Sequence, residues 1–168
     1  IDTIHTPYGT LQVVLGKECF TPDDVILDVG CGLGRPLAYL VGAKFPGKIV
    51  GAEINPPVAA RAAAWAEHYP NIEVVSSDVF LLDFSSFTHF FMWRPFVPDA
   101  FKRFVEKLEA EVARPVRVYY LSDTHTGDLL EGRTGWTIAR RDWVHYVHGI
   151  PQHGEPERYT IWDYQPML

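Results

Sequence analysis

The sequence predicts an α/β fold with a mostly parallel sheet, because short apolar runs alternate with segments of helical composition. Chain crossovers through helices are right-handed and place successive strands parallel in one sheet, covered on both faces. The expected strands, rich in β-branched or aromatic residues, are 25–29, 48–52, 72–76, 88–93 and 116–121. The expected helices are 35–43, 56–68 and 98–113.

Each helix is indicated by its ends or by an apolar face. Pro36 falls in the first turn of 35–43, where a missing N–H costs nothing. The segment 56–68 consists of Ala and other strong helix formers and ends at Tyr69-Pro70. The segment 98–113 is amphipathic. Its apolar face carries Phe101, Phe104, Val105 and Leu108.

The last third of the chain has a different pattern. Trp136–Val147 and Arg158–Tyr164 read as two strands with no helix between them, joined by a loop that is rich in Gly and Pro. We therefore expect an antiparallel hairpin at the edge of the parallel sheet, which brings the sheet to seven strands.

Length and charge narrow the class of protein. The chain has 168 residues, so we expect one domain over 1–168, with an N-terminal helical segment over 1–20. Because the first residue is Ile1 rather than Met, a truncated N-terminus is left open. The net charge of −6 argues against a broad nucleic-acid surface, and no apolar run reaches the roughly 20 residues of a membrane span. Cys19 and Cys31 need no disulfide, which favours a reducing, cytoplasmic location.

The strongest motif is the glycine-rich turn Asp28-Val-Gly30-Cys-Gly32-Leu-Gly34, between the first strand and the first helix. Glycines there let the backbone turn sharply and approach a ligand where a Cβ would clash. Open α/β sheets bind ligands at the carboxyl ends of their strands, where this turn lies. The alternative is a tight connection that binds nothing.

Two acidic residues strengthen the prediction of a ligand. Glu53 ends the second strand, about 20 residues beyond the turn, where a carboxylate can hold both hydroxyls of a ribose. Asp78 follows the third strand, within reach of an adenine amine. Each alone could be a surface carboxylate or a helix N-cap. Together with Asp28, they place three acids at one edge of the sheet.

The charges favour a cationic nucleoside over a dinucleotide. The third glycine of a dinucleotide-binding fingerprint is replaced by Arg35, and Gly34 comes one residue too early. Asp28 would repel a pyrophosphate but attract an ammonium group. S-adenosylmethionine, which has an ammonium, a sulfonium, a ribose and an adenine, fits better than NAD.

These residues resemble the motifs of the class I S-adenosylmethionine-dependent methyltransferases. The family's D/E-x-G-x-G-x-G motif is similar to 28–34, its ribose acid to Glu53, and its adenine-contacting acid to Asp78 followed by Val79. The resemblance implies a Rossmann-like seven-stranded sheet, with Asp28 holding the methionine amino group and S-adenosylhomocysteine as product. The opening Thr6-Pro7-Tyr8 is weakly similar to small bacterial members of the Dot1-like type. The implied cofactor-binding residues are Thr6, Asp28, Gly30, Cys31, Gly32, Gly34, Glu53, Ile54, Asp78, Val79 and Trp93.

The end of the fourth strand gives no specific acceptor signature. The sequence Phe91-Met-Trp-Arg-Pro-Phe96 departs from the N/D-P-P-Y/F/W motif of enzymes that methylate planar nitrogens, and it lacks the carboxylates of metal-dependent catechol methyltransferases. One interpretation is an aromatic wall that lines an acceptor pocket, with Trp93 against the sulfonium. Its residues are Phe90, Phe91, Trp93 and Phe96. For Phe90 and Phe91 the alternative is core packing.

Residues after the fifth strand are candidates for acid–base chemistry. Asp123 or His125 could act as a base, as alternatives to loop residues with local hydrogen bonds, and Trp93 is a further catalytic candidate. No metal is predicted, because the spacing of His145, His148 and His153 suits no ligand pattern. The hairpin arginines could meet an acidic acceptor or simply protect an edge strand. These are Arg140, Arg141 and Arg158.

The function predicted from the sequence is transfer of a methyl group from S-adenosylmethionine to a small molecule or a protein side chain such as lysine. No specific nucleic acid and no membrane is expected as a partner. Two alternatives stay open: a non-catalytic methyltransferase-like binding subunit, and a nicotinamide-dependent oxidoreductase.

Overall fold

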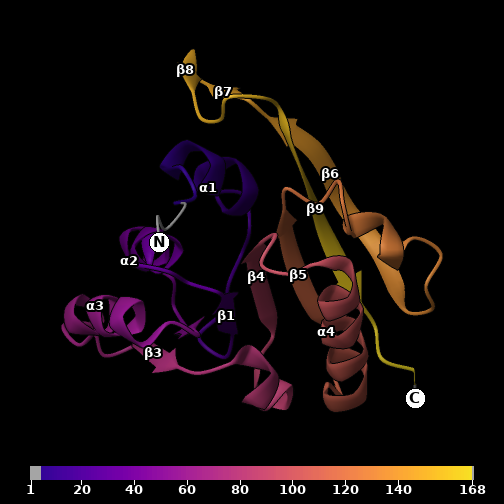
Figure 1. The fold of residues 1–168 in the computed structure, drawn as a ribbon, viewed down its shortest axis with the longest axis horizontal. Coiled ribbons are helices and arrows are strands. Elements are labelled where there is room, and N and C mark those ends of the chain that lie inside the picture. The colour runs from indigo at the N-terminus through magenta and orange to yellow at the C-terminus, as the bar shows by residue number, and fades with distance from the viewer. Residues whose placement is uncertain (1–4, 168) are drawn as a thin grey trace. The chain divides into compact units, whose positions relative to one another are not determined.

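A computed structural model describes residues 5–167, so Ile1 to Ile4 of the expected N-terminal segment and Leu168 lie outside the described residues. The chain divides into two compact units, the first ending at Leu82 and the second beginning at Asp83 (Figure 1). In the described part of the chain, no helix has the length and apolar character needed to cross a membrane.

The first unit contains three parallel strands in the order β3-β2-β1. Its elements are α1 (Tyr8–Leu15), β1 (Val25–Val29), α2 (Arg35–Gly42), β2 (Lys48–Glu53), α3 (Pro56–Ala66), β3 (Ile72–Ser76) and a 3-10 turn at Val79–Leu81. The interiors of β1 and β2 are mostly apolar and buried, with Ile26, Leu27 and Ile49 fully inaccessible to solvent. The residues of β3, at the end of the strand order, are half-buried or exposed. The register aligns the carboxyl ends of all three strands, since Val29 lies opposite Ala52, and Glu53 opposite Ser76.

The second unit contains a parallel pair extended by an antiparallel pair. β4 runs parallel to β5, and β9 runs antiparallel to both β5 and β6. Its elements are a 3-10 turn at Phe84–Ser86, β4 (His89–Trp93), α4 (Pro98–Glu111), β5 (Val116–Leu121), a 3-10 turn at Gly127–Leu130, β6 (Trp136–Val144), β7 (Tyr146–Val147), β8 (Ile150–Pro151) and β9 (Glu157–Tyr164). The C-terminal antiparallel hairpin expected from the sequence is therefore confirmed.

The hairpin differs from the expectation at its far end. β6 stops at Val144 rather than Val147, because its pairing with β9 ends where Val144 meets Glu157. The next residues form a separate two-stranded hairpin, β7–β8. Its turn is His148-Gly149, and both residues have positive φ, 51° and 77°. This is the backbone twist that two-residue hairpin turns require.

An aromatic cluster fills the core of the second unit. Phe84 lies 5.1 Å from Phe90 and 5.2 Å from Phe104, ring centroid to ring centroid. The ring of Phe101 on α4 packs 4.8 Å from Tyr120 on β5, which fixes the helix against the strand pair. Phe90 and Phe91 are 0% and 1% exposed. The structure thus supports the core alternative for both residues and not the aromatic wall of a pocket.

Candidate active site

The glycine-rich turn directly follows β1 and is tied to β2. The backbone N–H groups of Gly30 and Cys31 both donate to the carbonyl oxygen of Ala52, at 2.9 Å each. Gly30, Gly32 and Gly34 have φ values of 76°, 56° and 89°, the left-handed region that side chains disfavour. A Cβ on Gly34 would lie 2.7 Å from a ring carbon of Trp65. The turn therefore needs glycine for both conformation and space.

Asp28 is a buried acid at the end of β1. Its side chain is 3% exposed, and its Oδ2 atom is buried with no hydrogen-bond partner among the described residues. Burial, and secondly the charge of Glu53, raises the pKa of Asp28 from 3.8 to about 8. Buried polar atoms are nearly always paired, so an orphan carboxyl oxygen points to a missing ligand. A cationic group would satisfy it.

Glu53 ends β2 and fastens the glycine-rich turn, a role that the sequence analysis did not include. Its Oε2 atom accepts a hydrogen bond from the Gly32 N–H, and its Oε1 atom accepts one from the Asn55 N–H, both at 2.9 Å. A carboxylate oxygen has two lone pairs, so each atom keeps capacity for a ligand hydroxyl. The following residue, Ile54, is 68% exposed.

Asp78 follows β3 and begins the 3-10 turn at Val79–Leu81. Its Oδ1 atom accepts a hydrogen bond from the Phe80 N–H at 3.0 Å, so it is an N-cap. The N–H of Ser77 donates to the Glu53 carbonyl at 3.1 Å, which joins the ends of β2 and β3. Asp28, Glu53 and Asp78 thus lie at or just beyond the carboxyl ends of three adjacent parallel strands.

Three other predicted cofactor residues in the first unit, Thr6, Cys31 and Val79, are buried. Thr6, before α1, is 4% exposed. Cys31 packs against β2, where a Cβ on Gly51 would lie 2.8 Å from its Sγ atom. Burial, followed by the charges of Asp28 and Glu53, raises the pKa of the Cys31 thiol. The thiol therefore stays protonated and serves packing.

Trp93 belongs to the second unit, at the carboxyl end of β4. Its indole N–H donates to the Ser122 hydroxyl at 2.5 Å, and its ring meets His153 edge-on at 5.7 Å between centroids. The residues that follow β4 and β5, Arg94 and Ser122, have φ values of 37° and 54°. Left-handed backbone is uncommon for residues other than glycine. The sequence analysis weighed His153 only as a metal ligand and did not consider Ser122.

The candidate base Asp123 is fully buried and engaged within the second unit. It accepts hydrogen bonds from the Arg158 guanidinium at 2.6 Å and from the Thr160 hydroxyl at 2.5 Å. Arg158 also donates to Asp128 at 2.8 Å. These contacts favour a structural role for Asp123. The other candidate, His125, is exposed in the same loop.

The hairpin arginines are also engaged, which favours the structural alternative for them. Arg141 donates to Glu131 at 2.5 Å and to Thr160 at 2.8 Å. Arg140 lies 5.5 Å from the ring centroid of Tyr159. Among residues 5–167, no group of three or more His, Cys, Asp and Glu side chains could hold a metal ion.

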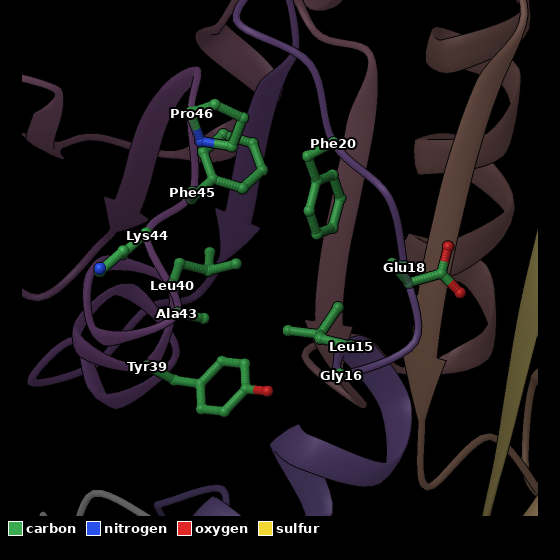
Figure 2. A pocket seen from close by; sticks show the side chains of 10 residues that line it. All are labelled: Leu15, Gly16, Glu18, Phe20, Tyr39, Leu40, Ala43, Lys44, Phe45 and Pro46. Carbon is green, nitrogen blue, oxygen red and sulfur yellow. The ribbon is translucent and has the colours of Figure 1, made fainter.

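A separate cavity of about 310 Å³ lies at the far end of α2 (Figure 2). Phe20 and Phe45 form its aromatic part, with ring centroids 4.7 Å apart. Tyr39 and Leu40 contribute from α2, and Leu15 from the end of α1. No predicted cofactor residue lines this cavity, so it is not the predicted cofactor site.

The chain is an α/β protein with a glycine-rich turn and three acids at the carboxyl ends of adjacent parallel strands. The methyltransferase domain family matches residues 26–115, more than half of the chain, and the chain belongs to this family. The match spans the turn, all three acids and the strands up to the start of β5. No curated protein sequence matches the chain.

Solved structures extend the similarity to nearly the whole chain. An RNA methyltransferase from Salinibacter ruber, in complex with S-adenosylhomocysteine, is 19% identical with a TM-score of 0.72, over 98% of this chain and 96% of that one. A SAM-dependent methyltransferase from Aquifex aeolicus is 17% identical with a TM-score of 0.67, over 92% and 89%. A SAM-dependent O-methyltransferase from Thermotoga maritima is 17% identical with a TM-score of 0.66, over 100% and 68%.

These comparisons confirm the Rossmann-like, mostly parallel seven-stranded fold with its C-terminal antiparallel hairpin. The protein is a methyltransferase, and its cofactor is S-adenosylmethionine. Family membership favours this class over the oxidoreductase alternative. The expectation that nucleic acid is not a partner finds no support, because similar structures include RNA and tRNA methyltransferases.

Proposed function

We propose that the first unit binds S-adenosylmethionine at the carboxyl ends of β1, β2 and β3, and that the methyl group goes to a small molecule or a protein side chain. The observation that carries this proposal is the buried carboxyl of Asp28, whose Oδ2 atom has no partner among residues 5–167. The methionine ammonium is the cation that this atom would hold. When bound, the cofactor supplies an activated methyl group on its sulfonium.

The other site residues contact the ribose, the adenine and the methionyl portion of the cofactor. Glu53 accepts from the ribose hydroxyls with the lone pairs that its two backbone contacts leave. The turn from Gly30 to Gly34 passes beneath the methionyl and ribose portion. Asp78 and Val79 hold the adenine. The remaining proposed contacts in the first unit are those of Thr6, Cys31 and Ile54. Trp93, which belongs to the second unit, stays a prediction from the sequence.

The chain's own contribution to catalysis is alignment and exclusion of water, since the sulfonium is already activated. A base is needed only where the acceptor must lose a proton. The segment after β4 lacks the N/D-P-P-Y/F/W motif and carries no carboxylate. This supports an acceptor other than a planar amide or adenine nitrogen. The two free thiols, Cys19 and Cys31, support a cytoplasmic location.

The binding half of the proposal is tested by titrating the protein with S-adenosylhomocysteine and, separately, with NADH. Glu53→Gln should weaken binding of S-adenosylhomocysteine about five- to tenfold, equivalent to about 1–1.4 kcal/mol, the scale of one hydrogen bond. The matched control is Glu73→Gln on β3, an exposed residue paired with Lys48 at 2.8 Å. Equal affinities for both variants, or binding of NADH alone, would overturn the assignment.

The catalytic half is tested with radiolabelled S-adenosylmethionine and fractionated cell extract. Label in small molecules or protein, with formation of S-adenosylhomocysteine, is the expected result. Label that is released by ribonuclease would assign the acceptor to RNA and overturn this part. Tight cofactor binding with no S-adenosylhomocysteine from any fraction would favour the non-catalytic binding subunit.

A further inference from the structure

The cavity of about 310 Å³ lies between the carboxyl ends of α1 and α2 (Figure 2). Leu15 is the last residue of α1, Ala43 follows the last residue of α2, and both line the cavity. The loop after α1 contributes Phe20. All of these residues belong to the first unit, and the volume falls within the range of about 300–1,000 Å³ that is typical of small-molecule sites.

The walls of this cavity are mainly aliphatic and aromatic. Leu15, Leu40 and Phe45 are 3%, 2% and 5% exposed. In Figure 2 the side chains of Leu15 and Leu40 point toward each other from the two helices. The rings of Phe20 and Phe45 lie 4.7 Å apart between centroids and are tilted by 55°, an arrangement that a third ring can extend. Such walls favour an apolar ligand with a ring, because binding removes apolar surface from water.

The two charged side chains of the cavity lie at its rim. Figure 2 shows the ammonium group of Lys44 and the carboxylate of Glu18 on opposite sides, each pointing away from the space that Leu15 and Leu40 face. A charged ligand would therefore lose its hydration without gaining an ionic partner inside, which is costly. The ligand class that this arrangement favours is uncharged.

Tyr39 supplies one polar group to the cavity. Its ring projects from α2, and its hydroxyl points toward the end of α1 at Leu15 and Gly16 (Figure 2). Burial raises the pKa of Tyr39, so the hydroxyl stays protonated at neutral pH and can donate a hydrogen bond. A ligand that fits this donor carries a hydrogen-bond acceptor, such as a carbonyl oxygen.

We propose that this cavity binds a small, uncharged ring compound with one hydrogen-bond acceptor, of the class of aromatic ketones and esters. The site is separate from the glycine-rich turn, because α2 lies between them. Gly34 of the turn precedes this helix, and the eight residues of α2 span about 12 Å before Ala43. The inference goes beyond the proposed function and does not depend on it.

The test measures binding of four matched probes by ligand-detected NMR titration. Acetophenone has a ring and one carbonyl, whereas ethylbenzene has the ring alone, benzoate adds a negative charge and benzylammonium a positive one. We expect acetophenone to bind with a dissociation constant of about 1 mM or tighter. Ethylbenzene should bind about three- to fivefold more weakly, and each charged probe at least about tenfold more weakly.

Two substitutions assign the binding to this cavity. Ala43→Phe places a ring in the space that its methyl group faces in Figure 2 and should weaken acetophenone binding at least about tenfold. The matched control is Ala64→Phe at an exposed position of α3, which should bind as the unaltered protein does. Tyr39→Phe removes only the hydroxyl, so it should weaken acetophenone about three- to fivefold and leave ethylbenzene unchanged. Thermal unfolding checks that each variant is folded.

Separate results overturn this inference and the proposed function. Acetophenone should bind equally well with and without saturating S-adenosylhomocysteine, since the two sites are distinct. Displacement of acetophenone by S-adenosylhomocysteine, equal affinity for benzoate, or unchanged binding in both folded Ala43→Phe and Tyr39→Phe would overturn the inference, as would no binding of any probe. Failure of S-adenosylhomocysteine to bind would overturn only the proposed function.

Discussion

Cofactor binding should release a proton from Asp28, and the structure sets the size of the effect. With a pKa of about 8, Asp28 is mostly protonated in the free protein at neutral pH. A bound ammonium favours the carboxylate, so the ligand selects the ionised form. That form is about 1% of the population at pH 6 and about half at pH 8. Affinity should therefore rise about 50-fold, or about 2 kcal/mol, between these pH values.

Isothermal titration calorimetry with S-adenosylhomocysteine measures this directly. Between pH 6 and 7, buffers of different ionisation enthalpy should report release of about one proton per ligand bound. Asp28→Asn should bind more weakly at pH 8 and show little change in affinity with pH. The matched control is Asp23→Asn, an exposed residue in the loop before β1. It should behave as the unaltered protein does.

The same substitution changes the stability of the ligand-free protein. The folded-state pKa of Asp28 lies above the unfolded value of 3.8, so the folded state binds the proton more tightly. This contribution to stability is present below pH 4 and is lost as the pH rises toward 8. Asp28→Asn should remove that slope and stabilise the free protein by up to about 5 kcal/mol at pH 8, as measured by urea denaturation. The reasoning would be refuted if the affinity for S-adenosylhomocysteine did not change between pH 6 and 8 and no proton were released on binding.

The remaining predictions concern stability and are measured by urea denaturation. Gly34→Ala should cost about 2 kcal/mol or more, because a Cβ would meet Trp65 at 2.7 Å and φ is 89°, whereas Gly42→Ala, with no atom within 4 Å, should be neutral or stabilising. Equal changes in stability for the two variants would show that the turn can accommodate a Cβ at residue 34. Arg158→Leu should cost about 3–5 kcal/mol, since it leaves the carboxylate of Asp123 buried without its cation. A loss below about 1 kcal/mol would mean that the carboxylate finds another partner.

Local patterns were sufficient to predict the candidate cofactor site. The strands 25–29, 72–76 and 116–121 have the predicted bounds, because apolar runs end at a glycine, a polar residue or a proline. An acid that ends a parallel strand must lie at the carboxyl edge, whatever the details of packing. Glu53 and Asp78 follow from this rule alone.

Long-range contacts could not be predicted in the same way. Asp123 and Arg158 are 35 residues apart, and only the antiparallel pairing of β5 with β9 brings them together. The contact of His153 with Trp93 depends on the β7–β8 hairpin, whose turn is His148-Gly149. Asn-Gly or Asp-Gly would have signalled this turn, but histidine is a weaker indicator.

The two backbone contacts of Glu53 affect how a ribose would bind, because they fix the orientation of its carboxylate. Both carboxylate oxygens are already held, by Gly32 on one side and Asn55 on the other. A glutamate that is free to rotate loses rotamer entropy when a ligand orders it. Here folding has already ordered the Glu53 rotamer, so binding of the sugar costs no further rotamer entropy in that side chain. The orientation of the Glu53 carboxylate, which we propose to bind the ribose, is thus set by folding.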